Sequence, residues 1–304
     1  MPAHEAPRRA RLFVALQHLL PQHALSRVVY HLTRSRVRVL KSLLIASFVR
    51  AFHPRMAEAA EPDPHRYPTF NHFFTRALRE GARPIAPEPA TVISPVDGAV
   101  SQIGQLAELT IIQAKGRHYR LDALLGALPA HGQHLPAAAE WTRRLRGGTF
   151  ATLYLAPYDY HRIHMPLAGA LRAAWYVPGR LFSVNAVTCG AVDSLYARNE
   201  RVVCAFDGER GVSFVIVLVG ALFVGSIGTL WHGEITPRGP RRRRELPSTA
   251  GASGTLGKGA EMGRFNMGST VIVLFPERTL EWAAALTTGS IVRMGETLGR
   301  LRTS

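Results

Sequence analysis

The sequence is poor in cysteine and in lysine, and each shortage narrows the kind of protein it can encode. Cys189 and Cys204 are its two cysteines, too few for a disulfide framework or a four-cysteine zinc site. Both are expected to be reduced thiols in the core. Lysine occurs only three times, so arginine carries most of the positive charge behind the formal net charge of +16. A hydrophobic content of 47% without a glycine repeat excludes a disordered or collagen-like chain.

Long apolar runs are also missing. The longest run, 212–227, is interrupted by Gly220 and Gly225 and is rich in β-branched residues, so it predicts two buried strands and not a membrane span. The apolar block at 12–20 follows arginines, but no small-residue cleavage site comes after it, and no signal peptide is predicted. A glycine-rich phosphate loop of the dinucleotide or P-loop kind is absent from the sequence as well.

The positive charge is concentrated in residues 1–60, where ten basic residues face two acidic ones. Two or three helices are predicted within 11–53, and the last has an apolar stripe at spacings of three and four, flanked by arginines. This pattern is typical of a helix that lies in the interface of an anionic membrane. A helix packed on its own domain would show the same stripe, whereas no nucleic-acid-binding module accompanies the charge. The stripe consists of Val37, Leu40, Leu44, Phe48 and Phe52.

Residues 61–304 are predicted to form a second, β-rich domain. Prolines mark its start, and Thr69 is expected to cap a short helix that runs to Leu78. The irregular spacing of the strands predicts an α+β fold with a largely antiparallel β core, barrel-like or sandwich-like. The arginine-rich segment 237–253 is predicted to be an exposed loop, and no role is assigned to it. The predicted strands are 91–93, 99–103, 149–155, 202–206, 212–219, 221–227 and 271–275.

Three short segments carry residues suited to chemistry. The turn at 94–98 projects the carboxylate of Asp97, although an aspartate there can also bond its own backbone. His161 and His164 could bind a metal or act separately as acid and base, and the lack of a third ligand cluster disfavours the metal. The third segment, 258–270, contains Gly268 and Ser269 just before a strand. A serine, a histidine and an aspartate permit nucleophilic catalysis, but their spacing does not establish that they meet.

Taken together, these segments resemble the bacterial phosphatidylserine decarboxylases, a family of pyruvoyl-dependent enzymes. The resemblance extends over nearly the whole chain, and the basic N-terminal helices occupy the place of the family's membrane-binding segment. Met267 stands where the family usually has leucine, a swap that nearly conserves volume. The matching motifs are YPTFNHFFTRALREGARPI at 67–85, SPVDGAVSQIG at 94–104, YLAPYDYHRIHMPLAG at 154–169, LFSVNAVT at 181–188, LYARNERVVCAF at 195–206 and KGAEMGRFNMGSTVIVLF at 258–275.

The resemblance implies a zymogen that cuts itself between Gly268 and Ser269. Asp97, His164 and Ser269 would form the self-cleavage triad, with Asp97 orienting His164, and His161 would serve the later decarboxylation. Ser269 would become a covalent pyruvoyl cofactor, with no metal required, that forms a Schiff base with phosphatidylserine and releases phosphatidylethanolamine and CO₂. Such a carboxy-lyase would consist of a β chain (1–268) and an α chain (269–304), held together by the strand at 271–275.

The implied partners are phosphatidylserine and an anionic membrane surface, with no nucleic acid. The protein would lie on the cytoplasmic side of the cell membrane as a peripheral protein, and the family precedent suggests a dimer of α/β pairs. Deletion of residues 1–55 is expected to release it from anionic liposomes and to leave self-cleavage largely intact. Two other functions fit the residues less well: a lipid hydrolase with a permanent Ser269 hydroxyl, and a catalytically silent membrane-binding scaffold.

Overall fold

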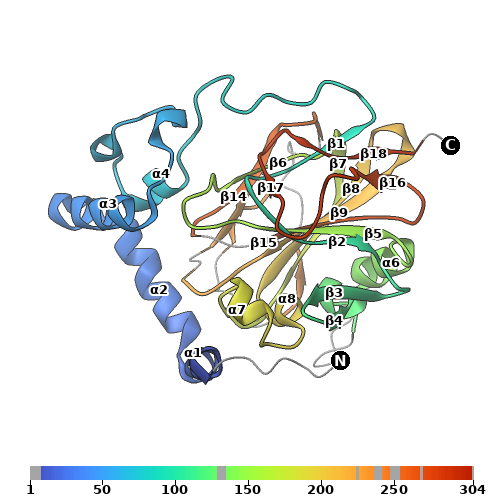
Figure 1. Cartoon of the computed structure of the whole chain (residues 1–304), viewed down its shortest axis with the longest axis horizontal. Helices are drawn as coiled ribbons and strands as arrows, with labels where there is room; N and C mark the ends of the chain where they lie inside the picture. Colours follow the sequence, from blue (N-terminus) through green and yellow to red (C-terminus); the bar gives the residue numbers. More distant parts are fainter. Residues whose placement is uncertain are drawn as a thin grey trace.

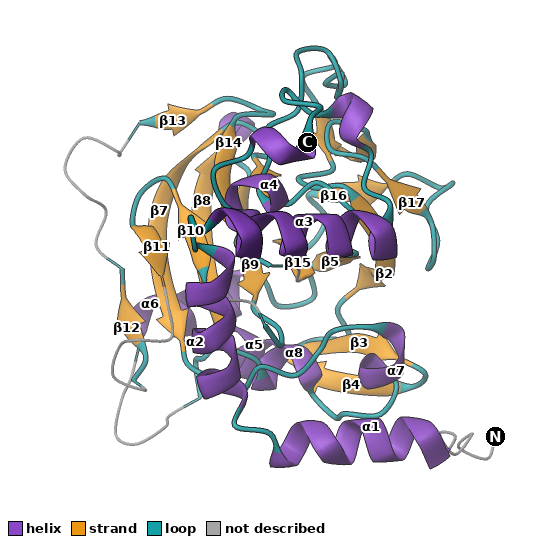
Figure 2. Cartoon of the chain, turned by 90° about the vertical axis from the view of Figure 1, so that its left-hand side faces the viewer, coloured by secondary structure: helices purple, strands orange, loops and turns teal. Residues whose placement is uncertain are grey.

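Three helices precede a β-rich body and lie along one side of it (Figure 1). The computed structural model describes residues 8–128, 135–223, 226–235, 242–246, 254–267 and 270–302. The helices are α1 (Arg8–Leu19), α2 (Gln22–Thr33) and α3 (Arg38–Phe52), which confirms the helical prediction for 11–53. Figure 2 looks onto this side, where α2 and α3 lie in front of the strands. None of the described helices combines the length and the apolar character that crossing a bilayer requires.

Helix α3 packs on a cluster of aromatic residues from α4 (Phe70–Phe74), which follows two 3₁₀ turns, η1 (Met56–Glu58) and η2 (Pro64–Arg66). The Thr69 hydroxyl accepts a hydrogen bond from the His72 amide, so the predicted cap is confirmed, although the helix ends at Phe74 and not at Leu78. The predicted apolar stripe of α3 is split. Phe48 packs in the aromatic cluster, whereas Val37 is 62% exposed and Phe52 41% exposed.

One large antiparallel sheet forms the centre of the body. Its strand β15 (Thr270–Phe275) pairs with β5 (Thr149–Tyr154) on one side and with β9 (Ser213–Val219) on the other. All six residues of β15 are buried because both faces of the sheet are covered, which explains its unbroken hydrophobic run. The full order is β12 (Arg244–Glu245), β7 (Gly169–Val177), β8 (Arg201–Gly208), β9, β15, β5, β2 (Gly98–Gln105) and β17 (Ile291–Val292), with β13 (Thr255–Leu256) also on β7.

Two smaller sheets cover one face of the large sheet, and short helices with a hairpin cover the other. Alternate residues of β15 point into the two cores: Val271, Val273 and Phe275 into the first, Ile272 and Leu274 into the second. The small sheets are β11 (Gly233–Ile235), β10 (Ile227–Thr229), β14 (Glu261–Phe265), β6 (Arg162–His164) and β1 (Thr91–Ile93), β18 (Thr297–Leu301), β16 (Leu280–Trp282). The other face carries β3 (Thr110–Ala114), β4 (Arg117–Arg120), α5 (Leu121–Leu125), α6 (Pro136–Arg144), α7 (Ala186–Cys189) and α8 (Leu195–Arg198). A 3₁₀ turn, η3 (Glu209–Gly211), connects β8 and β9.

The α+β class and the antiparallel core are confirmed, but the barrel alternative is wrong. Within the described residues the sheet is open, because its end strands β12 and β17 do not pair with each other. The predicted strand at 221–227 is also wrong: residues 221–223 form a turn, and β10 begins at Ile227 in another sheet. Cys189 and Cys204 are buried free thiols, as predicted.

The arginine-rich segment is only partly described. Residues 242–246 are not simply a loop, because Arg244 and Glu245 form β12 against β7. Arg243 donates to the Gly126 carbonyl at 2.9 Å, which fixes this segment on the turn after α5. The other predicted loop residues, 237–241 and 247–253, lie outside the described part of the chain.

Candidate active site

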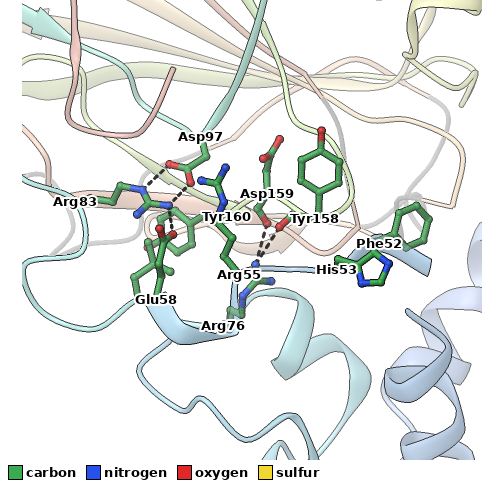
Figure 3. A pocket seen from close by; sticks show the side chains of 11 residues that line it. Phe52, His53, Arg55, Glu58, Arg76, Arg83, Asp97, Tyr158, Asp159 and Tyr160 are labelled. Atoms are coloured by element: carbon green, nitrogen blue, oxygen red, sulfur yellow. Dashed lines mark hydrogen bonds and ion pairs between the residues drawn. The ribbon is translucent and has the colours of Figure 1, made fainter. Parts of the chain in front are cut away.

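Asp97 lies in the turn between β1 and β2, and its carboxylate is held by residues far along the chain. The carboxylate is almost fully buried, and its Oδ1 accepts hydrogen bonds from the Met294 amide at 2.9 Å and from Arg83 Nε at 2.8 Å. Arg83 Nη2 reaches Oδ2 and also donates to Glu58 Oε2 at 2.7 Å (Figure 3). Asp97 is therefore half of a buried ion pair, and not an aspartate that bonds only its own turn.

The turn sits directly against β5 at Gly98. A side chain at this glycine would place its Cβ 2.3 Å from the Tyr154 carbonyl oxygen, so only glycine fits there. Tyr154 in turn lies opposite Thr270, the first residue of β15. The sheet register therefore brings Asp97 close to Thr270, the residue that directly follows Ser269.

His164, at the end of β6, is fixed on three sides. Its backbone amide donates to the Pro95 carbonyl at 2.8 Å, which ties it to the turn that carries Asp97. Its Nδ1 lies 2.8 Å from the Gly259 carbonyl oxygen, and its Nε2 lies 3.0 Å from the Tyr160 hydroxyl. A carbonyl only accepts, so Nδ1 carries the proton and Nε2 presents a lone pair to the Tyr160 O–H. The ring is thus oriented by the Gly259 carbonyl, and Asp97 is not among its hydrogen-bond partners.

His161 has a different environment from His164. Its ring is fully buried and stacks on Phe74 with the ring centres 4.1 Å apart. Nε2 lies 3.3 Å from the Pro157 carbonyl oxygen, whereas Nδ1 has no partner among the described residues. Burial lowers the pKa of His161 to about 3 and also lowers that of His164, so both rings are neutral at pH 7.

Gly268 and Ser269 lie outside the described residues, but both flanks of this junction are described. Met267 has a positive φ of 135°, in a region that favours glycine, and packs against the aromatic cluster under α3. Thr270 is completely buried, and its Oγ1 has no partner in the described part of the chain. The backbone is therefore strained immediately before the junction and fixed in the sheet immediately after it.

A polar cavity of about 240 Å³ opens beside Asp97, at the C-terminal end of α3 (Figure 3). Arg76 lines it and is 3% exposed; its Nη2 donates to the Tyr158 carbonyl at 3.1 Å, and it forms no ion pair with a described carboxylate. Burial lowers the pKa of Arg76 and raises that of Asp159, on the same wall, to about 6. Charged side chains of both signs therefore line this cavity. Its other lining residues include Phe52, Arg55, Glu58, Arg83 and Tyr160.

The structure thus places His164 beside the turn of Asp97 and His161 next to Phe265 of β14, and it adds residues that the sequence analysis did not single out. Arg83 and Tyr160 lie within the motifs quoted above, so the resemblance covers both positions, but it gave neither residue a role. Glu58 lies outside the motifs, and only the folded chain brings it to Arg83.

Comparisons with known proteins show which family the chain is similar to. A family model described as phosphatidylserine decarboxylase matches residues 70–300, and a second model, described as PSD, matches residues 12–53. A protein from Nitrosococcus oceani, named phosphatidylserine decarboxylase proenzyme, is 51% identical over 95% of this chain and 90% of its own. Proteins of the same name from Pseudomonas fluorescens and Saccharophagus degradans are 49% and 44% identical, each over 96% of this chain and 98% of its own. The chain therefore belongs to the phosphatidylserine decarboxylase family.

Proposed function

We propose that this chain is a phosphatidylserine decarboxylase proenzyme. It cuts itself between Gly268 and Ser269, converts Ser269 into a pyruvoyl group, and then converts phosphatidylserine into phosphatidylethanolamine and CO₂. The observation that carries the proposal is the match, over nearly the full length, to relatives that bear this name. The bond that ties His164 to the turn of Asp97, and the sheet register that brings this turn near Thr270, support it.

Self-cleavage requires a base, and His164 has the correct tautomer for it. Once the Tyr160 hydroxyl moves away, His164 Nε2 can accept the proton of the Ser269 hydroxyl. The serine oxygen then attacks the Gly268 carbonyl and converts the amide into an ester. Elimination breaks the ester, and hydrolysis of the resulting dehydroalanine releases ammonia. Asp97, fixed by Arg83, supplies a nearby negative charge that favours the imidazolium formed at His164.

Two buried polar atoms near the junction are available to a pyruvoyl group at position 269. These are Thr270 Oγ1 and His161 Nδ1, both without described partners. When formed, this group supplies an electrophilic carbonyl that takes up the substrate amine and accepts the electron pair left by CO₂. His161 enters the reaction as a neutral imidazole. An anionic substrate nearby raises its pKa, so the ring takes up a proton from solvent and then delivers it to the α-carbon of the substrate, ending neutral again.

The N-terminal helices are proposed to lie on the anionic, cytoplasmic surface of the cell membrane. Gln17 and Gln22 dock α1 and α2 on the body through the Ser183 and Leu181 amides, so these helices also pack on their own domain. Their outer surface nevertheless carries large exposed apolar side chains among arginines. The most exposed are Leu16, Leu19, Val28, Val37, Val39 and Leu43, from 50% to 82%. The cavity beside Asp97 lies at the end of α3 and is our candidate site for the headgroup.

Replacement of Val39 and Leu43 by glutamate is expected to weaken binding to anionic vesicles. Burial of two such side chains contributes a few kcal/mol, and the added charges are repelled, so the loss should be roughly 10- to 100-fold. Co-sedimentation with phosphatidylglycerol vesicles measures it. Ile291→Glu is the matched control, because Ile291 is 71% exposed on β17, away from the helices. Equal binding of both variants would contradict the proposed membrane surface.

The activity itself is tested with the purified full chain and vesicles that contain carboxyl-labelled phosphatidylserine. Labelled CO₂ and phosphatidylethanolamine are expected in equal amounts. A fluorophosphonate probe should leave the processed protein unlabelled, because no serine hydroxyl remains at position 269. Labelling at Ser269 without CO₂ release would favour a lipid hydrolase. The absence of both labelling and CO₂ release would favour a membrane-binding scaffold.

A further inference from the structure

Asn266, two residues before the proposed cut, is held by polar groups from distant parts of the chain. Its backbone amide donates to the Ser226 carbonyl at 3.1 Å, and its side-chain Nδ2 donates to the Ser226 hydroxyl at 2.6 Å. Its Oδ1 accepts a hydrogen bond from Asn71 Nδ2, in α4, at 3.1 Å. Asn266 is 5% exposed, so these bonds lie out of competition with water.

Glu234, on β11, connects this asparagine to helix α2. One of its carboxylate oxygens, Oε1, lies 3.2 Å from Asn266 Nδ2 and also accepts from the Ser226 hydroxyl. Arg34, the C-cap residue of α2, forms an ion pair with the same oxygen, and the Tyr30 hydroxyl lies 3.3 Å from Oε2. A continuous polar network therefore runs from the end of α2 to the residue that precedes Met267.

The strained backbone at Met267 lies between two residues that the surrounding structure holds in place. Asn266 is held by the network, and Thr270 is held by β5 and β9 on either side of β15. A positive φ at a methionine persists only where the surrounding structure enforces it, and such residues occur at functional sites. The attack of a serine hydroxyl on the preceding carbonyl needs a geometry that an extended peptide does not adopt.

We propose that Asn266, Glu234 and Arg34 are positioning residues for self-cleavage, which makes helix α2 part of the processing machinery. This inference rests on the proposed cut between Gly268 and Ser269. The network fixes the residues before the cut so that the Gly268 carbonyl is presented to the Ser269 hydroxyl. Deletion of residues 1–55 removes Arg34 and the α3 side chains that cover Met267. On this basis such a deletion slows self-cleavage as well as membrane binding, contrary to the expectation from sequence.

The test follows self-cleavage of the full chain during cell-free synthesis, with pulse-labelling and separation of the two fragments over time. Glu234→Ala and Asn266→Ala are expected to slow cleavage roughly 10- to 100-fold, as small displacements of reacting groups do. Glu234→Gln keeps an oxygen for Ser226 and Asn266, so it should recover much of the rate. Glu108→Ala is the matched control, because it breaks an exposed ion pair with Arg146 in the loop before β3. It should cleave at the rate of the unmodified chain.

Two further measurements distinguish an effect on the positioning of the reacting groups from destabilisation of the fold. Combining Arg34→Ala with Asn266→Ala should slow cleavage by clearly less than the product of the two single fold-changes, because both act through one network. Each variant is also made with Ser269→Ala, and the thermal unfolding midpoints of these uncut chains are compared. Slow cleavage with an unchanged midpoint supports the proposal. The positioning proposal is overturned if the variants are cut at the rate of the unmodified chain, or if cleavage slows only in variants whose unfolding midpoint falls sharply. Either result leaves the proposed function intact. If the unmodified chain itself stays uncut, the proposed function is wrong.

Discussion

Ser269→Ala leaves the protein as a single chain of 33.3 kDa, whereas the unmodified protein yields two chains. The variant lacks the hydroxyl that attacks the Gly268 carbonyl, so neither the ester nor the pyruvoyl group forms, and decarboxylation is abolished. Intact-mass measurement under denaturing conditions distinguishes the outcomes. The unmodified protein should show a chain that ends at Gly268 and a 36-residue chain whose first residue has lost its amino group.

A matched control removes a serine hydroxyl elsewhere. Ser213→Ala, on β9, should be cut like the unmodified protein, because its hydroxyl contacts only the Asp207 carboxylate among its described partners. Two fragments from Ser269→Ala would show that the cut lies at another bond. A single mass for the unmodified protein, persisting after long incubation, would mean that the triad does not act, and the hydrolase and scaffold functions would then need to be considered.

Alanine substitutions of His161 and His164 are expected to block different steps, turnover and self-cleavage respectively. His164→Ala should remain full-length, because it removes the imidazole Nε2 that is the proposed base for the Ser269 hydroxyl. His161→Ala should still be cut, but its turnover should fall by roughly 100-fold or more, as expected when a proton donor is removed. Intact mass reports the cut, and labelled CO₂ released per mole of cut chain reports turnover.

His118, exposed on β4, provides the control for this pair. His118→Ala should be cut and should turn over normally. The appearance of both fragments in His161→Ala also shows that loss of the stacking on Phe74 leaves the fold intact. If both His161→Ala and His164→Ala stay uncut, the proposed division of roles is wrong.

The sequence predicted individual elements better than it predicted how they pair. β15 was evident because a strand buried on both faces is hydrophobic at every position. β7 was missed because its first half, with Gly169 and four nearby alanines, has low strand propensity. The barrel alternative failed because hydrophobic periodicity gives the faces of a strand but not its neighbours.

The same limit applies to the site. Asp97, His161 and His164 could be proposed as site residues because their motifs are local in sequence and resemble a known family. The bond from Arg34 to Glu234 joins residues 200 positions apart, and that from Asn71 to Asn266 joins residues 195 positions apart. Contacts of this kind depend on tertiary packing, so no local pattern of residues predicts them. The orientation of His164 by the Gly259 carbonyl belongs to the same class.

The position of β15 also determines when the enzyme can become active. This strand comes after both of its neighbours in the chain, yet it fills the middle of the large sheet, between β5 and β9. A chain still emerging from the ribosome cannot build that sheet, because the strands on either side lack their common neighbour. The bond proposed to break lies immediately before this strand. If that bond is the one cut, activation is confined to the time after β15 has left the ribosome and joined the sheet, and the cut marks a molecule whose central sheet is complete.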